Sequence, residues 1–242
     1  MATSVISSRR PKVQSDRIFY PAMCLLVLVT VWMGFAKSYY AAGLVHANLP
    51  SAIVHVHAIA FTLWLLTLVV QTTLVSVRKV KLHMSLGLGG FSLAAAMVVL
   101  GSLAAVDSLR RGMSPPWSGL SPEVFFVIPA TDILLFAVLA AWAYAVRRRP
   151  DQHKRLIMIA TISLLDAAIG RFPATVTPMG PLTQMIILFS FLAIMASYDV
   201  ITRKSIHRVT WIASLIIIVV QVARVPLAQT ASWVHFAHII RG

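Results

Sequence analysis

The stretch "SAIVHVHAIAFTLWLLTLVVQTTLV", from Ser51 to Val75, decides the fold class of this chain. It contains no Asp, Glu, Lys or Arg, and it is longer than the ~20 residues that a helix needs to cross a bilayer. Two histidines, His55 and His57, lie inside it. The stretch therefore predicts a membrane-spanning helix that carries polar groups.

The composition extends this prediction to the whole chain. Of its 242 residues, 59% are apolar and only 12% are charged, which is too little polar surface for a soluble domain. The net charge of +14 comes from short basic clusters between apolar runs, a pattern typical of membrane topology and not of a nucleic-acid-binding face. We therefore expect an all-α, polytopic integral membrane protein that contacts the lipid bilayer and binds no nucleic acid.

Seven apolar segments are close to the length of a spanning helix. They predict a cytoplasmic tail (1–17), a seven-helix transmembrane domain (18–227) and a short external C-terminal tail (228–242). The fifth segment is the shortest. The segments run from 18 to 37, 52 to 77, 82 to 106, 124 to 146, 156 to 172, 182 to 201 and 209 to 227.

The distribution of basic residues predicts the orientation. Fifteen of the 21 Lys and Arg residues fall on the side that holds the N-terminus, and six fall on the other side. Basic residues hold connecting loops in the cytoplasm. We therefore expect the N-terminus inside, the C-terminus outside, and a multi-pass protein of the inner (plasma) membrane of a bacterium.

Polar side chains of four predicted helices lie at similar depth in the outer half of the bilayer. A charged group at the bilayer centre costs about 2.5–3.5 kcal/mol, so each one requires an explanation. These side chains predict a ligand- or proton-binding site, with a structural ion pair of Asp166 with Arg171 or Arg224 as the alternative. They are His55 and His57 in the second segment, Asp132 in the fourth, Asp166 and Arg171 in the fifth, and Gln221 and Arg224 in the seventh.

Helical geometry separates the two histidines of the second segment. Residues two apart on a helix point about 200° away from each other, so His55 and His57 cannot ligate one metal ion together. His57 shares a stripe with Trp64 and Gln71. We expect His57 to face a polar cavity in the outer half, and His55 to pack against a different neighbour.

Three stretches resemble a group of uncharacterised bacterial multi-pass membrane proteins: "HVHAIAFTLWLLTLVVQT", "KLHMSLG" and "DQHKRLIMIATISLLDAAIGRF". That group shows a histidine early in one helix, an "LHRxLG"-like start to the next, and an "HRRxM…R"-like helix afterwards. Met84 replaces the usual basic residue of the second motif. A more distant resemblance is to small membrane proteins implicated in the maturation of haem-containing oxidases. The resemblance to the uncharacterised group implies a cytoplasmic-boundary motif of His83, His153 and Arg155. The other positions of this chain that match that group are His57, Gly87 and Arg171.

The first functional hypothesis is a haem- or metal-associated protein of the respiratory membrane, acting with respiratory-chain proteins in electron transfer or oxidase assembly. His57 would be the first ligand, with His55, His46 or a histidine of the tail (His235, His238) as its partner, and Arg171 or Arg224 would pair with haem propionates. A buried haem with two histidine ligands needs them at similar depth on different helices. The outer half offers two histidines on one helix only, which counts against this hypothesis.

The second hypothesis is a proton-coupled transporter of a small anion. Asp132 and Asp166 would exchange protons, His57 would relay them, and Arg171 and Arg224 would attract the anion. A membrane enzyme ranks last, because the sequence contains no zinc-protease helix, nucleophile elbow or phosphate-binding loop.

The charge distribution makes a testable prediction about topology. Reporter fusions should place the N-terminus and the "RRRPDQHKR" loop (147–155) in the cytoplasm and the C-terminus outside. Two termini on the same side of the membrane would contradict a seven-crossing chain.

Overall fold

In the computed structural model, which describes residues 10–41, 51–115 and 118–242, the described chain is helical and contains no strand. The prediction of an all-α protein is therefore confirmed for these residues. The elements are α1 (Arg10–Phe35), the π-helical turn η1 (Ala36–Tyr40), α2 (Ala52–Ser76), α3 (Val80–Arg110), α4 (Pro122–Phe125), α5 (Val127–Ala145), α6 (Pro150–Ile162), α7 (Asp166–Ile169), α8 (Pro181–Arg203), α9 (Arg208–Ala228) and α10 (Ala231–Arg241).

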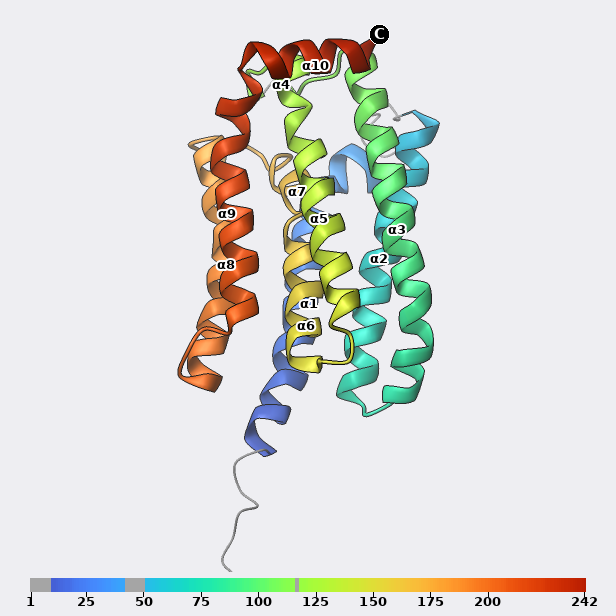
Figure 1. Ribbon diagram of the computed structural model, residues 1–242, viewed down its shortest axis with the longest axis vertical. Coiled ribbons are helices and arrows are strands. Elements are labelled where there is room, and N and C mark those ends of the chain that lie inside the picture. The colour runs from blue at the N-terminus through green and yellow to red at the C-terminus, as the bar shows by residue number, and fades with distance from the viewer. Residues whose placement is uncertain (1–9, 42–50, 116–117) are drawn as a thin grey trace, which may run out of the picture.

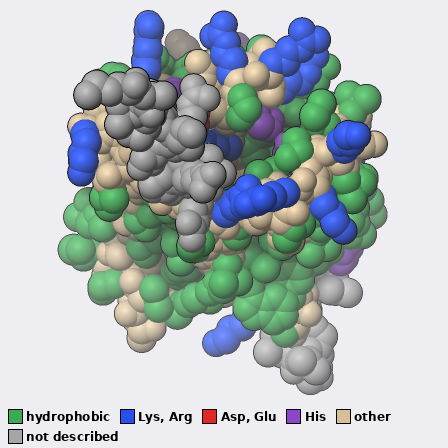
Figure 2. Space-filling model, turned by 90° about the horizontal axis from the view of Figure 1, so that it is seen from below, with side chains coloured by type: hydrophobic (Ala, Val, Ile, Leu, Met, Phe, Trp, Pro, Cys, Tyr) green, Lys and Arg blue, Asp and Glu red, His purple; other side chains and the backbone are tan. Residues whose placement is uncertain are grey.

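The long helices run side by side along the long axis of the molecule, and α10 lies across one end of the bundle (Figure 1). We call this the α10 end. The opposite end holds the start of α1 and the turns 77–79, 146–149 and 204–207, which join α2 to α3, α5 to α6, and α8 to α9. We call it the basic end, because lysine and arginine side chains gather on it (Figure 2).

Six helices of the described chain are long and apolar enough to cross a membrane: Ser15–Tyr40, Ala52–Ser76, Val80–Arg110, Pro122–Ala145, Pro181–Arg203 and Arg208–Ala228. Large apolar side chains such as Leu25, Leu88 and Ile201 are exposed on their outer faces. In water this surface would be unfavourable, whereas lipid tails are as apolar as leucine. The chain is therefore a multi-pass membrane protein with a lipid-facing surface.

The fifth predicted segment differs from the other six, because it forms two short helices in place of one long one. Between α6 and α7 the backbone tightens: the amide nitrogens of Leu164 and Leu165 donate to carbonyl oxygens three residues back, at 3.2 and 3.0 Å. The hydroxyl of Ser163 also donates to the carbonyl oxygen of Ala160 at 2.8 Å. Pro173 follows α7 and cannot donate a helical hydrogen bond. We call residues 150–169 the broken helix.

The broken helix lies in the middle of the bundle. It contacts α1, α5, α8 and α9, and Leu156, Ile159 and Ile162 are fully buried. These side chains therefore face other helices and not lipid. The position of the broken helix therefore determines how the other helices pack.

The predicted external tail is largely helical. Trp233 of α10 donates through Nε1 to the carbonyl oxygen of Glu123 at 2.9 Å, and Arg241 forms an ion pair with the side chain of Glu123. Because α10 contacts α3, α4 and α9, the tail is part of the folded bundle.

The close approach of α1 to the broken helix is testable at Gly34. A Cβ atom at this position would lie 2.7 Å from the Cα atom of Ala168 in α7, closer than any real contact of that kind. Gly34→Ala should therefore lower the free energy of unfolding in detergent by about 1–3 kcal/mol, through overpacking. The matched control is Gly89→Ala in α3, where nothing lies within 4 Å of the added atom. That variant should be stabilised by about 0.5–1 kcal/mol, because alanine favours helices. Equal thermal midpoints for the two variants would contradict the packing described here.

Candidate functional site

A cavity of about 1120 Å³ opens at the basic end, between α1, α2, α3, the end of α5 and the start of α6. Small-molecule sites usually have volumes of about 300–1,000 Å³, so this cavity can hold a large cofactor. Its aromatic lining residues are Tyr20, Trp64, Phe91 and Tyr144, its uncharged polar ones include Gln71, His83 and His153, and its charged ones are Asp16, Arg17, Arg78, Arg147, Arg148 and Lys154.

The charge of this lining is strongly positive. Five basic side chains face one carboxylate, and Lys154 already pairs with that carboxylate, of Asp16, at 2.6 Å. The view onto the basic end shows lysine and arginine side chains around the face, with histidine side chains between them (Figure 2). The cavity therefore suits a ligand with an apolar body and anionic groups near the opening.

Two histidines from different helices meet in the cavity wall. His83 lies in the first turn of α3, and His153 lies in the first turn of α6. Their ring centroids are 6.4 Å apart, and the ring planes are inclined by 71°. Both side chains are half-buried. The sequence marked both residues through the resemblance, but it did not show that they face each other.

Each imidazole is oriented through its Nδ1 atom. His153 Nδ1 lies 3.1 Å from the carbonyl oxygen of Ala143. His83 Nδ1 accepts a hydrogen bond from the side-chain amide nitrogen of Gln71 in its favourable orientation, in which the Gln71 oxygen accepts from the amide nitrogen of Gly87 at 3.2 Å. Within the described part of the chain these contacts use Nδ1 of each ring, so Nε2 is the atom that a ligand can reach. In His83 this contact leaves the ring proton on Nε2, so a metal could bind there only after the Gln71 contact is released.

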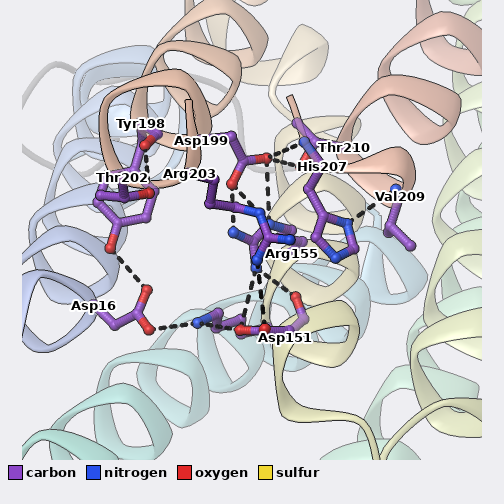
Figure 3. Close-up of polar contacts among 11 residues, drawn as sticks. Asp16, Asp151, Arg155, Tyr198, Asp199, Thr202, Arg203, His207, Val209 and Thr210 are labelled. Atoms are coloured by element: carbon purple, nitrogen blue, oxygen red, sulfur yellow. Dashed lines mark hydrogen bonds and ion pairs between the residues drawn. The ribbon is translucent and has the colours of Figure 1, made fainter. Parts of the chain in front are cut away.

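Arg155 holds α6 against α8 and α9 (Figure 3). Its side chain is fully buried, and its Nε donates to Asp199 Oδ1 at 3.0 Å. Asp199 Oδ2 accepts from the hydroxyl of Thr210 at 2.6 Å and from the backbone nitrogen of His207 at 3.1 Å. The sequence does not predict this pair, because nothing in the local pattern relates residues 44 positions apart.

His207, in the turn before α9, is part of the same network. Burial lowers the pKa of this histidine, and the positive charges of Arg155 and Arg203 lower it further. A neutral ring fits the contact that the structure shows, in which His207 Nδ1 accepts a hydrogen bond from the backbone nitrogen of Val209 at 3.1 Å. His207 therefore caps α9.

Four of the seven predicted outer residues meet near the α10 end. Arg224 donates to Asp132 Oδ1 at 2.8 Å and forms an ion pair with Asp166. Gln221 Nε2 donates to Asp166 Oδ2 at 2.7 Å. The partner of Asp166 is thus Arg224 and not Arg171. We call Asp132, Asp166, Gln221 and Arg224 the outer cluster.

The other three predicted outer residues lie elsewhere. His55 Nδ1 is 3.2 Å from the hydroxyl of Tyr39. His57 stacks on Phe61, with ring centroids 6.5 Å apart, and Arg171 lies over the ring of Phe35 at 4.4 Å. None of the contacts described for these side chains reaches the outer cluster. His46 lies outside the described residues, and His235 and His238 belong to α10.

The stripe of His57, Trp64 and Gln71 does not form one site. Trp64 Nε1 donates to the hydroxyl of Thr161 at 3.2 Å in the core, and Gln71 contacts His83 at the basic end. The three residues share a face of α2, as the sequence predicts, but they contact different neighbours along it.

No protein-family model, curated protein or solved structure matches this chain. The resemblance to uncharacterised bacterial membrane proteins and to oxidase-maturation proteins therefore stays a prediction.

Within the described chain, no group of three or more His, Cys, Asp or Glu side chains is placed to hold a metal ion.

The Arg155–Asp199 pair is open to a double-mutant test. Arg155→Met and Asp199→Leu should each destabilise the protein by about 3–5 kcal/mol, because each leaves one buried charge unpaired. The double variant should recover much of this loss. Arg203→Met is the control, because Arg203 is 28% exposed and pairs at 3.6 Å with the 49% exposed Asp151, and such surface pairs contribute about 0–1 kcal/mol. Strictly additive losses in thermal unfolding would mean that the pair is not coupled.

Proposed function

We propose that the chain is a haem-associated protein of the bacterial inner membrane, in which His83 and His153 would hold haem in the cavity at the basic end. The observation that carries this proposal is the pair of histidines from two helices, facing each other at one depth. Among the described residues of the outer half, no such pair from two helices is found.

The spacing of the two rings supports coordination to one iron. With metal–nitrogen bonds of about 2.0–2.1 Å, two imidazoles on opposite sides of one metal ion have ring centres about 6 Å apart. The centroids of His83 and His153 are separated by 6.4 Å. Metal-ligating histidines usually hydrogen-bond a carbonyl or another polar group through their second nitrogen. The carbonyl oxygen of Ala143 occupies that position for His153. For His83 the Gln71 amide nitrogen donates to Nδ1, so ligation by His83 would require this amide to turn away.

The walls and the opening of the cavity support the same ligand. Trp64, Phe91 and Tyr144 offer apolar surface to a macrocycle. Arg147 and Arg148, at the opening, can pair with the two propionates, since guanidinium groups bind carboxylates through paired hydrogen bonds. In this proposal Arg147 and Arg148 pair with the haem propionates, whereas the sequence suggested Arg171 or Arg224 for that pairing.

The proposal includes the topology. We take the broken helix as the seventh crossing, with the N-terminus and the basic end in the cytoplasm and α10 outside. The start of α1 and helix α10 lie at opposite ends of the bundle, which supports an odd number of crossings (Figure 1). Haem would then face the cytoplasmic side, where an oxidase-assembly or respiratory-chain partner would meet it.

The alternative of an anion transporter has less support. Arg224 is already engaged by two carboxylates, and Arg171 donates to the carbonyl oxygen of Ala167 and covers Phe35. His57 is not in contact with the outer cluster through any described hydrogen bond. The residues assigned to anion attraction and proton relay therefore do not form one pathway.

A haem titration of the purified protein tests the proposal. The wild-type protein should bind haem with the absorption spectrum of a low-spin, six-coordinate iron. His83→Ala and His153→Ala should each give a five-coordinate or high-spin spectrum, and the double variant should lose specific binding.

His55→Ala and His57→Ala are the matched controls in this titration. Both remove a histidine from a membrane-spanning helix without touching the cavity, so their spectra should equal that of the wild type. Unchanged haem binding in the His83/His153 double variant, or a spectral change in His57→Ala alone, would contradict the proposal.

A further inference from the structure

The outer cluster is unbalanced in charge. Arg224 contributes one positive charge, whereas Asp132 and Asp166 together contribute two negative charges when both are ionised. Asp132 is 5% exposed, Gln221 4% and Arg224 8%. An uncompensated charge in such surroundings costs several kcal/mol. A net charge of −1 therefore needs a compensating ion.

The neighbouring helices do not supply the missing positive charge. The charged groups that act electrostatically on Asp132 are Arg224 and Asp166, and those that act on Arg224 are the same two aspartates. Among the described residues no charged group acts on Arg171, so it does not balance the cluster, and Arg241 pairs with Glu123. The other titratable groups on the surrounding helices are Asp16, Arg17, Tyr20 and Cys24 on α1, His55 and His57 on α2, Lys81, His83, Asp107 and Arg110 on α3, Arg111 just after it, Tyr144 on α5, Asp151, His153, Lys154 and Arg155 on α6, Tyr198, Asp199 and Arg203 on α8, Arg208 on α9, and His235 and His238 on α10.

Two buried polar atoms of the cluster lack a partner in the described structure. They are Gln221 Oε1, an acceptor, and Arg224 Nε, a donor. The amide of Gln221 points into the cluster, because its Nε2 donates to Asp166. An ionised carboxylate only accepts hydrogen bonds, so it cannot satisfy Gln221 Oε1. A carboxylic acid carries an O–H group, which is the kind of donor that this oxygen lacks.

We infer that the outer cluster is a proton-binding site, in which Asp132 and Asp166 share one proton and Arg224 balances the remaining negative charge. On binding, the proton forms one O–H bond at a carboxylate oxygen, and the cluster changes from −1 to neutral with no electron transfer. A metal cation fits less well, because the guanidinium of Arg224 already lies against both carboxylates. The site is separate from the haem cavity, and its test requires no haem.

Infrared difference spectroscopy can detect this proton directly. The protein is measured in detergent, and a parallel sample carries [4-¹³C]aspartate. At neutral pH the unlabelled protein should show the C=O stretch of one protonated aspartic acid. The band should shift on labelling and on transfer to D₂O. Because wild-type protein is used, this measurement does not depend on the folding of any variant.

Two neutral variants then locate the proton. Asp132→Asn and Asp166→Asn each leave one carboxylate for Arg224, so the charge balances without a proton and the band should disappear in both. Glu123→Gln is the control, because Glu123 pairs one-to-one with Arg241 and its loss should leave the band unchanged. No protonated aspartate in the wild type, a band that survives in both Asn variants, or a band that appears only when sodium is removed would each overturn the inference.

Discussion

Every charge that is buried in this bundle must be balanced inside the bundle, and the broken helix is where that constraint acts most strongly. At the basic end its Arg155 is fully buried against Asp199 of α8, with Thr210 of α9 completing the carboxylate's hydrogen bonds. Toward the α10 end its Asp166 meets Arg224 of α9. Two ion pairs at opposite ends thus hold a helix that is interrupted in between. Because removing one partner of a buried pair is far more costly than a surface substitution, these contacts define one position for the helix.

The placement of the histidine pair follows from the same anchor. Arg155 and His153 are two residues apart on α6, so their side chains point about 200° away from each other. With Arg155 directed at α8 and α9, His153 is directed to the opposite side, where His83 of α3 lies. Lys154, between them in sequence, reaches Asp16 of α1. Three consecutive side chains of α6 therefore contact different neighbours, and two of them, His153 and Lys154, line the cavity.

Much of the architecture could be predicted from the sequence, because apolar length and charge are local properties. The prediction of long apolar helices joined by basic turns at one end agrees with the structure, and so does the meeting of Asp132, Asp166, Gln221 and Arg224. The break at residues 163–165 could not be predicted in this way, since the residues just before it are apolar and Ser163 alone is a weak signal. The contact of His83 with His153 was also missed. It depends on how α3 and α6 pack, which no spacing within one helix reveals.

The broken helix carries His153 to the proposed haem site opposite His83. An experimental structure of the haem-loaded protein in a lipid nanodisc should show planar density between α3 and α6, in contact with His83 and His153, with its carboxylates at the basic opening. The same structure should show a helix that is interrupted at residues 163–165. Haem density beside His57, or a continuous fifth helix with His153 turned away from His83, would contradict it.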